Sequence, residues 1–132
     1  MRTTPPRAAQ ATLHKAAFDF LLQQFALYAD DPPDQRWQWL EAAHVMGQTS
    51  LPLHWRSHVA MLRYAITLRD GREALGQILR LALVPLGHAL QRLPLGNTGR
   101  SHVSAFRPML PEPGIGALIR MALSHVALNT PG

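Results

Sequence analysis

The sequence predicts an all-α fold of helical hairpins, with the paired-helix packing of solenoid-like proteins and one long ordered loop rich in proline and glycine. Two patterns support this: apolar residues recur at three- and four-residue spacing in five segments, and proline, glycine and aspartate lie between the segments. The 132 residues, 47% hydrophobic and 16% charged, have room for one core and are too apolar for a disordered chain. We therefore expect one helical domain over residues 1–132.

The first two helices are expected at about residues 5–29 and 35–48. Thr4 followed by Pro5 is typical of a helix start. The apolar residues that follow at helical spacing are Leu13, Ala17, Phe20, Leu21 and Phe25. The aspartates and prolines of residues 30–34 end this helix and supply an N-cap for the next.

A third helix is expected at about residues 53–68. Its predicted core positions are Trp55, Val59, Leu62 and Ile66. The connector between it and the second helix has only about four residues, and a connector of this length favours an antiparallel hairpin.

The remaining chain predicts two further helices and the loop. Asp70 and Glu73 have the spacing of a capping box for a helix at about residues 71–83, which Pro85 and Gly87 then disturb. Residues 93–114 are rich in proline and glycine and predict an irregular loop. An amphipathic helix follows at about residues 115–128.

Charge and cysteine content limit the function classes. The formal net charge is +5, but the arginines are scattered singly, so nucleic acid is not the expected partner. The chain has no cysteine, so a metal must use histidine, carboxylate, amide or methionine ligands. Because no apolar segment is long enough to span a bilayer, we expect a cytoplasmic protein without a membrane partner.

Two groups of polar side chains lie on the expected hairpin. Glu41 and His44 are three apart on the second helix, and His54 and His58 are four apart on the third, so each pair shares a helix face. Folding back near Ser50 brings the level of His44 opposite residues 54–58. These side chains are therefore expected to converge at the edge of the core.

Two interpretations of this group remain open. In the first, hydrogen bonds from Glu41 and Gln48 to the histidines pin the hairpin. In the second, a divalent transition metal is held by the three histidines, with Glu41 as a fourth ligand or as an orienting group. Gln48 and Met61 are second-shell groups or alternative ligands. Zinc, iron, manganese and nickel fit nitrogen and oxygen donors, and a sulfur ligand from Met61 would favour copper.

The other histidines are isolated: His14, His88, His102 and His125. We expect each on the surface or with a single hydrogen bond. Gly96-Asn97-Thr98-Gly99 predicts a turn whose glycines adopt positive φ. Its alternative role is an anion site, together with Arg100 and His102.

The same residues resemble a family of small bacterial proteins, domain of unknown function 3703. The first marks of this resemblance are Trp37, Leu40, Glu41, Ala43, His44, Gly47, Gln48, His54, His58, Met61 and Leu62. The later marks are Asp70, Glu73, Gly76, Gln77, Arg80, Pro94, Gly96, Asn97, Thr98, Gly99, Val103, Pro108 and Met109. The family has no settled activity, so the resemblance implies only that the histidine hairpin and the glycine loop belong to one recurrent unit. Residues 110–114 depart from the family pattern.

The leading hypothesis is therefore a non-enzymatic protein that binds a divalent transition metal for metal handling or sensing. One alternative is a helical protein-interaction module in which the histidines are structural. A further alternative is a metal-dependent hydrolase with Glu41 as general base on a bound water. The metal, any substrate, the protein partner and the oligomeric state are not determined by the sequence.

Overall fold

The computed structural model describes residues 4–90, 99–100 and 112–131, and within these residues it contains five helices and no strand. They are α1 (Arg7–Leu27), α2 (Pro33–Gly47), α3 (Leu51–Thr67), α4 (Gly71–Ala89) and α5 (Pro113–Asn129). The all-α prediction is confirmed. Residues 93–98 and 101–111 of the expected loop lie outside the described residues.

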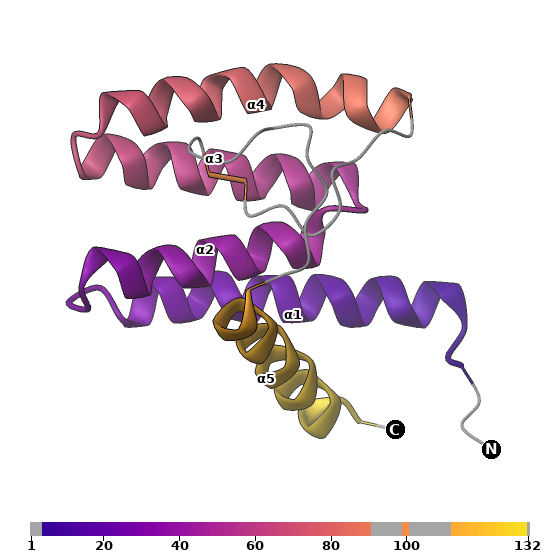
Figure 1. The fold of residues 1–132 in the computed structure, drawn as a ribbon. Coiled ribbons are helices and arrows are strands. Elements are labelled where there is room, and N and C mark those ends of the chain that lie inside the picture. Colours follow the sequence, from indigo (N-terminus) through magenta and orange to yellow (C-terminus); the bar gives the residue numbers. More distant parts are fainter. Residues whose placement is uncertain (1–3, 91–98, 101–111, 132) are drawn as a thin grey trace.

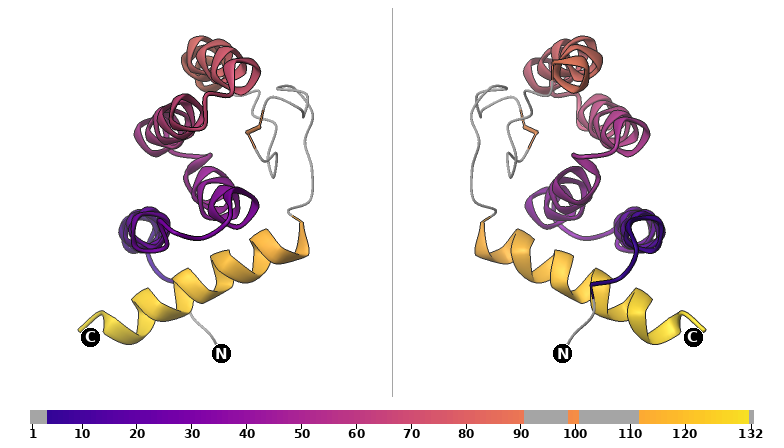
Figure 2. Two further views of the ribbon diagram at one scale, coloured as in Figure 1. Left: turned by 90° about the vertical axis from the view of Figure 1, so that its left-hand side faces the viewer. Right: turned by 90° about the vertical axis from the view of Figure 1, so that its right-hand side faces the viewer.

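Helices α1 to α4 form one curved layer. Figure 1 shows them as successive antiparallel rods, and the end-on views of Figure 2 show the row bending toward the side on which residues 99–100 lie. Helix α5 crosses the row obliquely and packs against α1 and α2. Helices α1 to α4 thus each contact their neighbours in sequence, as in paired-helix modules, whereas α5 returns to the first two helices of the row.

The helix starts follow from local chemistry. Asp70 precedes α4, and its Oδ1 accepts a hydrogen bond from the Glu73 backbone N–H at 3.0 Å, as the capping-box spacing predicts. Helices α2, α3 and α5 each have a proline in the first turn, where a missing N–H breaks no intrahelical bond. Four helices have ends within two residues of those expected from the sequence.

The expected end of the fourth helix near residue 83 is wrong, because α4 continues through Pro85 to Ala89. Proline in a helix interior removes one hydrogen bond, but packing on either side holds the helix here. Val84 is buried before the proline, and His88 contacts His54 after it.

The predicted core stripe of the third helix is also partly wrong. Trp55 is 42% and Ile66 61% exposed. The buried face of α3 instead comprises Leu53, His54, Ser57, His58, Met61, Tyr64 and Ala65. Because α3 packs against both α2 and α4, the neighbours determine which arc of the helix is buried, and that arc includes polar residues.

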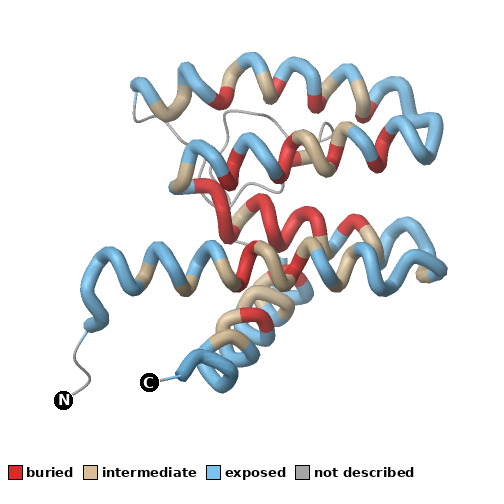
Figure 3. The backbone as a smooth tube through the Cα atoms, turned by 180° about the vertical axis from the view of Figure 1, so that it is seen from behind, coloured by how far each residue is buried: buried red, intermediate tan, exposed pale blue. Residues whose placement is uncertain are grey.

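The apolar core has two parts. One joins α1, α2, the start of α3 and α5, and its buried members are Ala17, Phe18, Leu21, Ala42, Ala43, Met46, Leu53, Ile115 and Ala122. The other lies between α2 and α3 and consists of Trp37, Leu40, Met61, Tyr64 and Ala65. Figure 3 shows the buried positions concentrated on the middle helices. None of the helices in the described part of the chain has the length and hydropathy needed to cross a membrane.

Replacing Gly47 by alanine is expected to destabilise the fold, because α2 and α3 touch at this glycine. A Cβ there would lie 2.8 Å from the Leu53 Cβ and 3.1 Å from a Phe18 ring carbon. We expect Gly47→Ala to lower the free energy of unfolding by about 1–3 kcal/mol in urea titrations. Gly71→Ala is the control, because a Cβ at that position meets nothing within 4 Å. Equal midpoints for the two variants would contradict this packing.

Candidate metal centre

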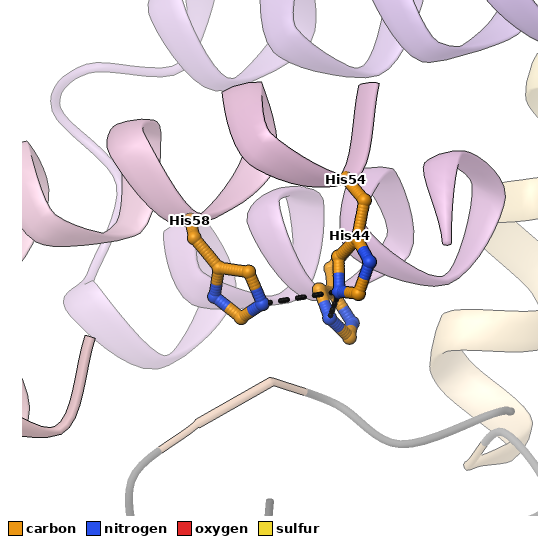
Figure 4. A group of neighbouring side chains, drawn as sticks. All are labelled: His44, His54 and His58. Atoms are coloured by element: carbon orange, nitrogen blue, oxygen red, sulfur yellow. Dashed lines mark hydrogen bonds between the residues drawn. The ribbon is translucent and has the colours of Figure 1, made fainter. Parts of the chain in front are cut away.

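Three buried histidines from two helices point toward one another. His44 comes from α2, and His54 and His58 come from successive turns of α3 (Figure 4). His54 Nε2 lies 3.1 Å from His44 Nε2 and 3.2 Å from His58 Nε2. One ring nitrogen from each histidine lies within 4.8 Å of those of the other two, so this triad is close enough to hold a metal ion.

Two of the three separations between these nitrogens suit binding to one metal ion. Two nitrogens bound to one ion at about 2.0–2.1 Å stand about 2.8–3.4 Å apart in octahedral or tetrahedral geometry. The two short separations in the triad, 3.1 and 3.2 Å, fall in this range. The same separations also suit hydrogen bonds between imidazoles, so they are compatible with a structural network as well.

A glutamine fixes the protonation of His58. The Gln77 Nε2 group donates to Glu73 Oε1 at 3.0 Å and to the Gly99 carbonyl at 2.8 Å. Both of these are acceptors, so the amide orientation is determined, and Gln77 Oε1 must accept the 2.7 Å bond from His58 Nδ1–H. A neutral His58 therefore carries its lone pair on Nε2, which faces the triad.

The fourth histidine in this network is His88. Its Nε2 lies 3.0 Å from His54 Nδ1, the nitrogen of His54 that faces away from the triad. Sequence reasoning placed His88 among the isolated histidines, each expected on the surface or with a single hydrogen bond. Continuation of α4 through Pro85 brings it into contact with His54.

Burial keeps the imidazole rings of His54 and His58 neutral. The exposed fractions of His44, His54 and His58 are 2%, 4% and 2%. Burial, together with the charges of the neighbouring His58 and His88, lowers the pKa of His54 to about 3. Burial also lowers the pKa of His58 to about 4, although its bond to Gln77 opposes the shift. Near neutral pH the rings of His54 and His58 are thus in the form that offers lone pairs to a metal.

Gly99 and Arg100 close one side of the triad. A Cβ on Gly99, whose φ is +82°, would lie 2.9–3.0 Å from ring atoms of His44, so only glycine fits. Arg100 donates through Nε to Glu73 at 2.7 Å and through Nη1 to Glu41 at 3.3 Å. Its guanidinium also lies 3.7 Å from the centre of the Trp37 ring.

The Glu41 carboxylate forms an ion pair with Arg100. Its carboxylate does not belong to the group of ligand atoms found within 4.8 Å of one another in the described residues. Burial raises the pKa of Glu41 to about 7, and Arg100 opposes that shift. Glu41 therefore supports the segment that covers the triad through Arg100.

None of the other predicted site residues belongs to the triad, and four of them lie outside the described residues. Gln48 is buried at the end of α2, and Met61 belongs to the apolar cluster between α2 and α3. Gly96, Asn97, Thr98 and His102 of the proposed anion site lie outside the described residues. His14 is exposed, and the exposed His125 stacks on Phe20.

Sequence reasoning missed three important groups: Gln77, Glu73 as an ion-pair partner, and the Arg100 bridge. Glu73 and Gln77 lie four residues apart on α4, and Arg80 lies in the next turn. The side chains of Glu73, Gln77 and Arg80 are all buried. Polar residues at helical spacing were the signal that could have revealed this face. Arg80 Nη2 donates to the Arg100 carbonyl at 2.7 Å and thus completes the attachment of this segment to α4.

The metal-free protein is expected to lose stability in acid. Below pH 6.5 the unfolded chain gains protons on His54 and His58 that the folded chain takes up only near pH 3 and pH 4, respectively. Each histidine then lowers the free energy of unfolding by about 1.4 kcal/mol per pH unit. Glu41 acts oppositely, because the folded carboxyl binds its proton near pH 7 and the unfolded one near 4.5.

Glu41→Gln is therefore expected to steepen the acid loss between pH 6.5 and 4.5 by about 1.4 kcal/mol per pH unit. Urea titrations at stepwise lower pH, in the presence of a chelator, measure this slope for both proteins. Parallel curves would contradict the assigned protonation of Glu41.

Comparison with known proteins places this arrangement in a family. No curated protein and no solved structure matches the chain. A family model described as "Protein of unknown function (DUF3703)" matches residues 12–119, a range that includes the triad, Gln77 and Arg100. The chain therefore belongs to the domain of unknown function 3703 family, as the resemblance in its sequence indicates.

Proposed function

We propose that this protein binds one divalent transition metal ion through the Nε2 atoms of His44, His54 and His58, and that it serves metal handling or sensing. One observation carries the proposal. Three buried imidazoles direct nitrogens at one another, and the bond from His58 Nδ1 to Gln77 leaves the His58 Nε2 lone pair facing the group.

Proton counting within the group supports this interpretation. In a neutral network without metal, the lone pair of His58 Nε2 needs a proton from His54 Nε2, whereas a proton donated by His44 Nε2 needs the lone pair of that same atom. Only one of the two contacts can then be a full hydrogen bond. A metal ion satisfies all three lone pairs at once. His54 Nδ1 then carries the proton and donates it to His88 Nε2, the outer hydrogen bond that metal-binding histidines usually make.

The surroundings favour binding over catalysis. A hydrolytic metal site needs an open coordination position beside solvent, whereas all three imidazoles are nearly fully buried. Glu41, the general base of the hydrolase alternative, is held by Arg100. The donor set remains compatible with zinc, iron, manganese, nickel and copper.

The alternative is a protein-interaction module in which the same histidines form a structural hydrogen-bond network. The distances of 3.1 and 3.2 Å support this network equally well. The two functions differ in what stabilises the fold: an ion in one case, and interchain contacts and imidazole hydrogen bonds in the other.

Metal content separates these functions. We expect the untagged protein, purified without chelator, to carry about one ion per chain by inductively coupled plasma mass spectrometry. His54→Gln and His58→Gln are expected to lose this ion, because two imidazoles hold a transition metal far less tightly than three. His14→Gln is the matched control, since His14 is exposed on α1.

Circular dichroism first establishes that each variant is folded. Titration of the metal-free parent with zinc, nickel, manganese, iron and copper ions then identifies the preferred metal from the rise in melting temperature. Equal metal content in the parent and both triad variants, or no metal and no stabilisation in any protein, would reject the proposal.

Gln77→Met is expected to weaken metal binding roughly 10- to 100-fold without changing the ligands, because His58 then loses the acceptor that orients its ring. Competition with a coloured chelator measures this affinity. Gln23→Met, an exposed substitution on α1, is the control. An unchanged affinity in folded Gln77→Met would show that this bond does not orient a ligand.

A further inference from the structure

Helix α4 buries its polar side and exposes its apolar side. Its buried residues are Glu73, Gln77, Arg80 and Val84, which face α3 and residues 99–100. At about 100° per residue, the opposite side carries the residues that we call the α4 stripe: Leu75, Ile78, Leu79, Ala82, Leu86 and Leu90. All six are exposed. In a monomer this arrangement would leave the most apolar face of the helix in water.

The spacing of the α4 stripe is typical of helix pairing. Leu75, Leu79, Ala82 and Leu86 follow one another at intervals of four, three and four, the pattern of a seam between two packed helices. The stripe is also symmetric about its middle. Leu79 and Leu86 lie at equal distances from the point between residues 82 and 83, and so do Leu75 and Leu90.

We propose that the α4 stripe is the interface with a second copy of this chain, packed antiparallel about a two-fold axis near Ala82. In this arrangement Leu79 of each copy meets Leu86 of the other, and Leu75 meets Leu90. The small Ala82 at the axis lets the two helices approach closely. Each copy thus presents the same patch to the other, as two-fold symmetry requires.

The area of the stripe is sufficient for a weak dimer. Its five large residues are 52% to 69% exposed. Two such stripes together bury on the order of 1,000 Å², the lower limit for a stable interface. Since α4 is the last helix of the curved row, a second α4 would also continue the same side-by-side helix packing.

Charge favours the antiparallel orientation. Arg72 is exposed beside one end of the stripe. Antiparallel packing separates the two copies of Arg72 by roughly 30 Å along the helices, well beyond the Debye length of about 8–10 Å. Parallel packing would place the two arginines side by side. The antiparallel pair also sets the two helix dipoles against each other.

The first test is the mass in solution. We expect the full chain to show twice its mass of 14.7 kDa in sedimentation equilibrium at about 100 µM. Leu79→Glu and Leu86→Glu are expected to be monomeric, with unchanged circular dichroism because both positions are exposed. Leu128→Glu, an exposed substitution on α5, is the control that should remain a dimer. A monomeric parent, or a dimer that Leu79→Glu leaves intact, would overturn the proposal.

Cross-linking tests the orientation. Because the chain has no cysteine, a single introduced cysteine reports one position. Ala82→Cys is expected to form a disulfide between two copies under mild oxidation. Leu75→Cys alone is not, because its two copies stand roughly 22 Å apart in the antiparallel pair. A mixture of Leu75→Cys and Leu90→Cys should cross-link. Efficient self-cross-linking of Leu75→Cys would rule out the antiparallel dimer.

Discussion

The Gln77 side chain is the constraint on which the arrangement of the site depends. It is fully buried, accepts a hydrogen bond from His58 Nδ1–H, and donates to Glu73 and to the carbonyl of Gly99. One amide thus sets the tautomer of a histidine on α3, orients a carboxylate on α4 and holds residues 99–100 over the triad. Glu73 in turn binds Arg100, which reaches Glu41 on α2. Three helices and a distant segment meet through hydrogen bonds, each with a defined donor and acceptor.

Such a network explains why polar groups replace apolar ones between α3 and α4. A buried glutamine or glutamate without partners would be costly, whereas here Gln77 and Glu73 bond to each other and to His58, Gly99 and Arg100. A polar layer of this kind also restricts how the helices can align, since sliding by one turn would break several bonds at once. The curvature of the helix row leaves space on its inner side for residues 99–100 (Figure 2).

The sequence predicted the parts of this structure that depend on local signals. Helix existence and the N-cap at Asp70 follow from spacing and capping chemistry, and the meeting of His44 with His54 and His58 follows from a short connector. The family resemblance rested on many of the same positions.

The rest depended on tertiary contacts that spacing does not encode. Pro85 signals a helix end locally, yet packing on either side carries α4 past it. Trp55 is a large apolar residue of a type common in cores, but α2 and α4 bury a neighbouring arc of α3 instead. Gln77 and Arg100 are separated by many residues from the histidines that they support, so no local pattern links them. On α4 the apolar face points outward, which no rule based on a single chain anticipates.

The three histidines lie close together in the sequence, so they can come together early in the synthesis of the chain. All three imidazoles lie within residues 44–58, on a hairpin that emerges from the ribosome before Gln77 and Gly99 do. Local hairpins form quickly because little chain entropy is lost in closing them. On this order of emergence the imidazoles meet before Gln77 and Gly99 cover them, so the ion that we propose would reach the group from a side that is still open to solvent.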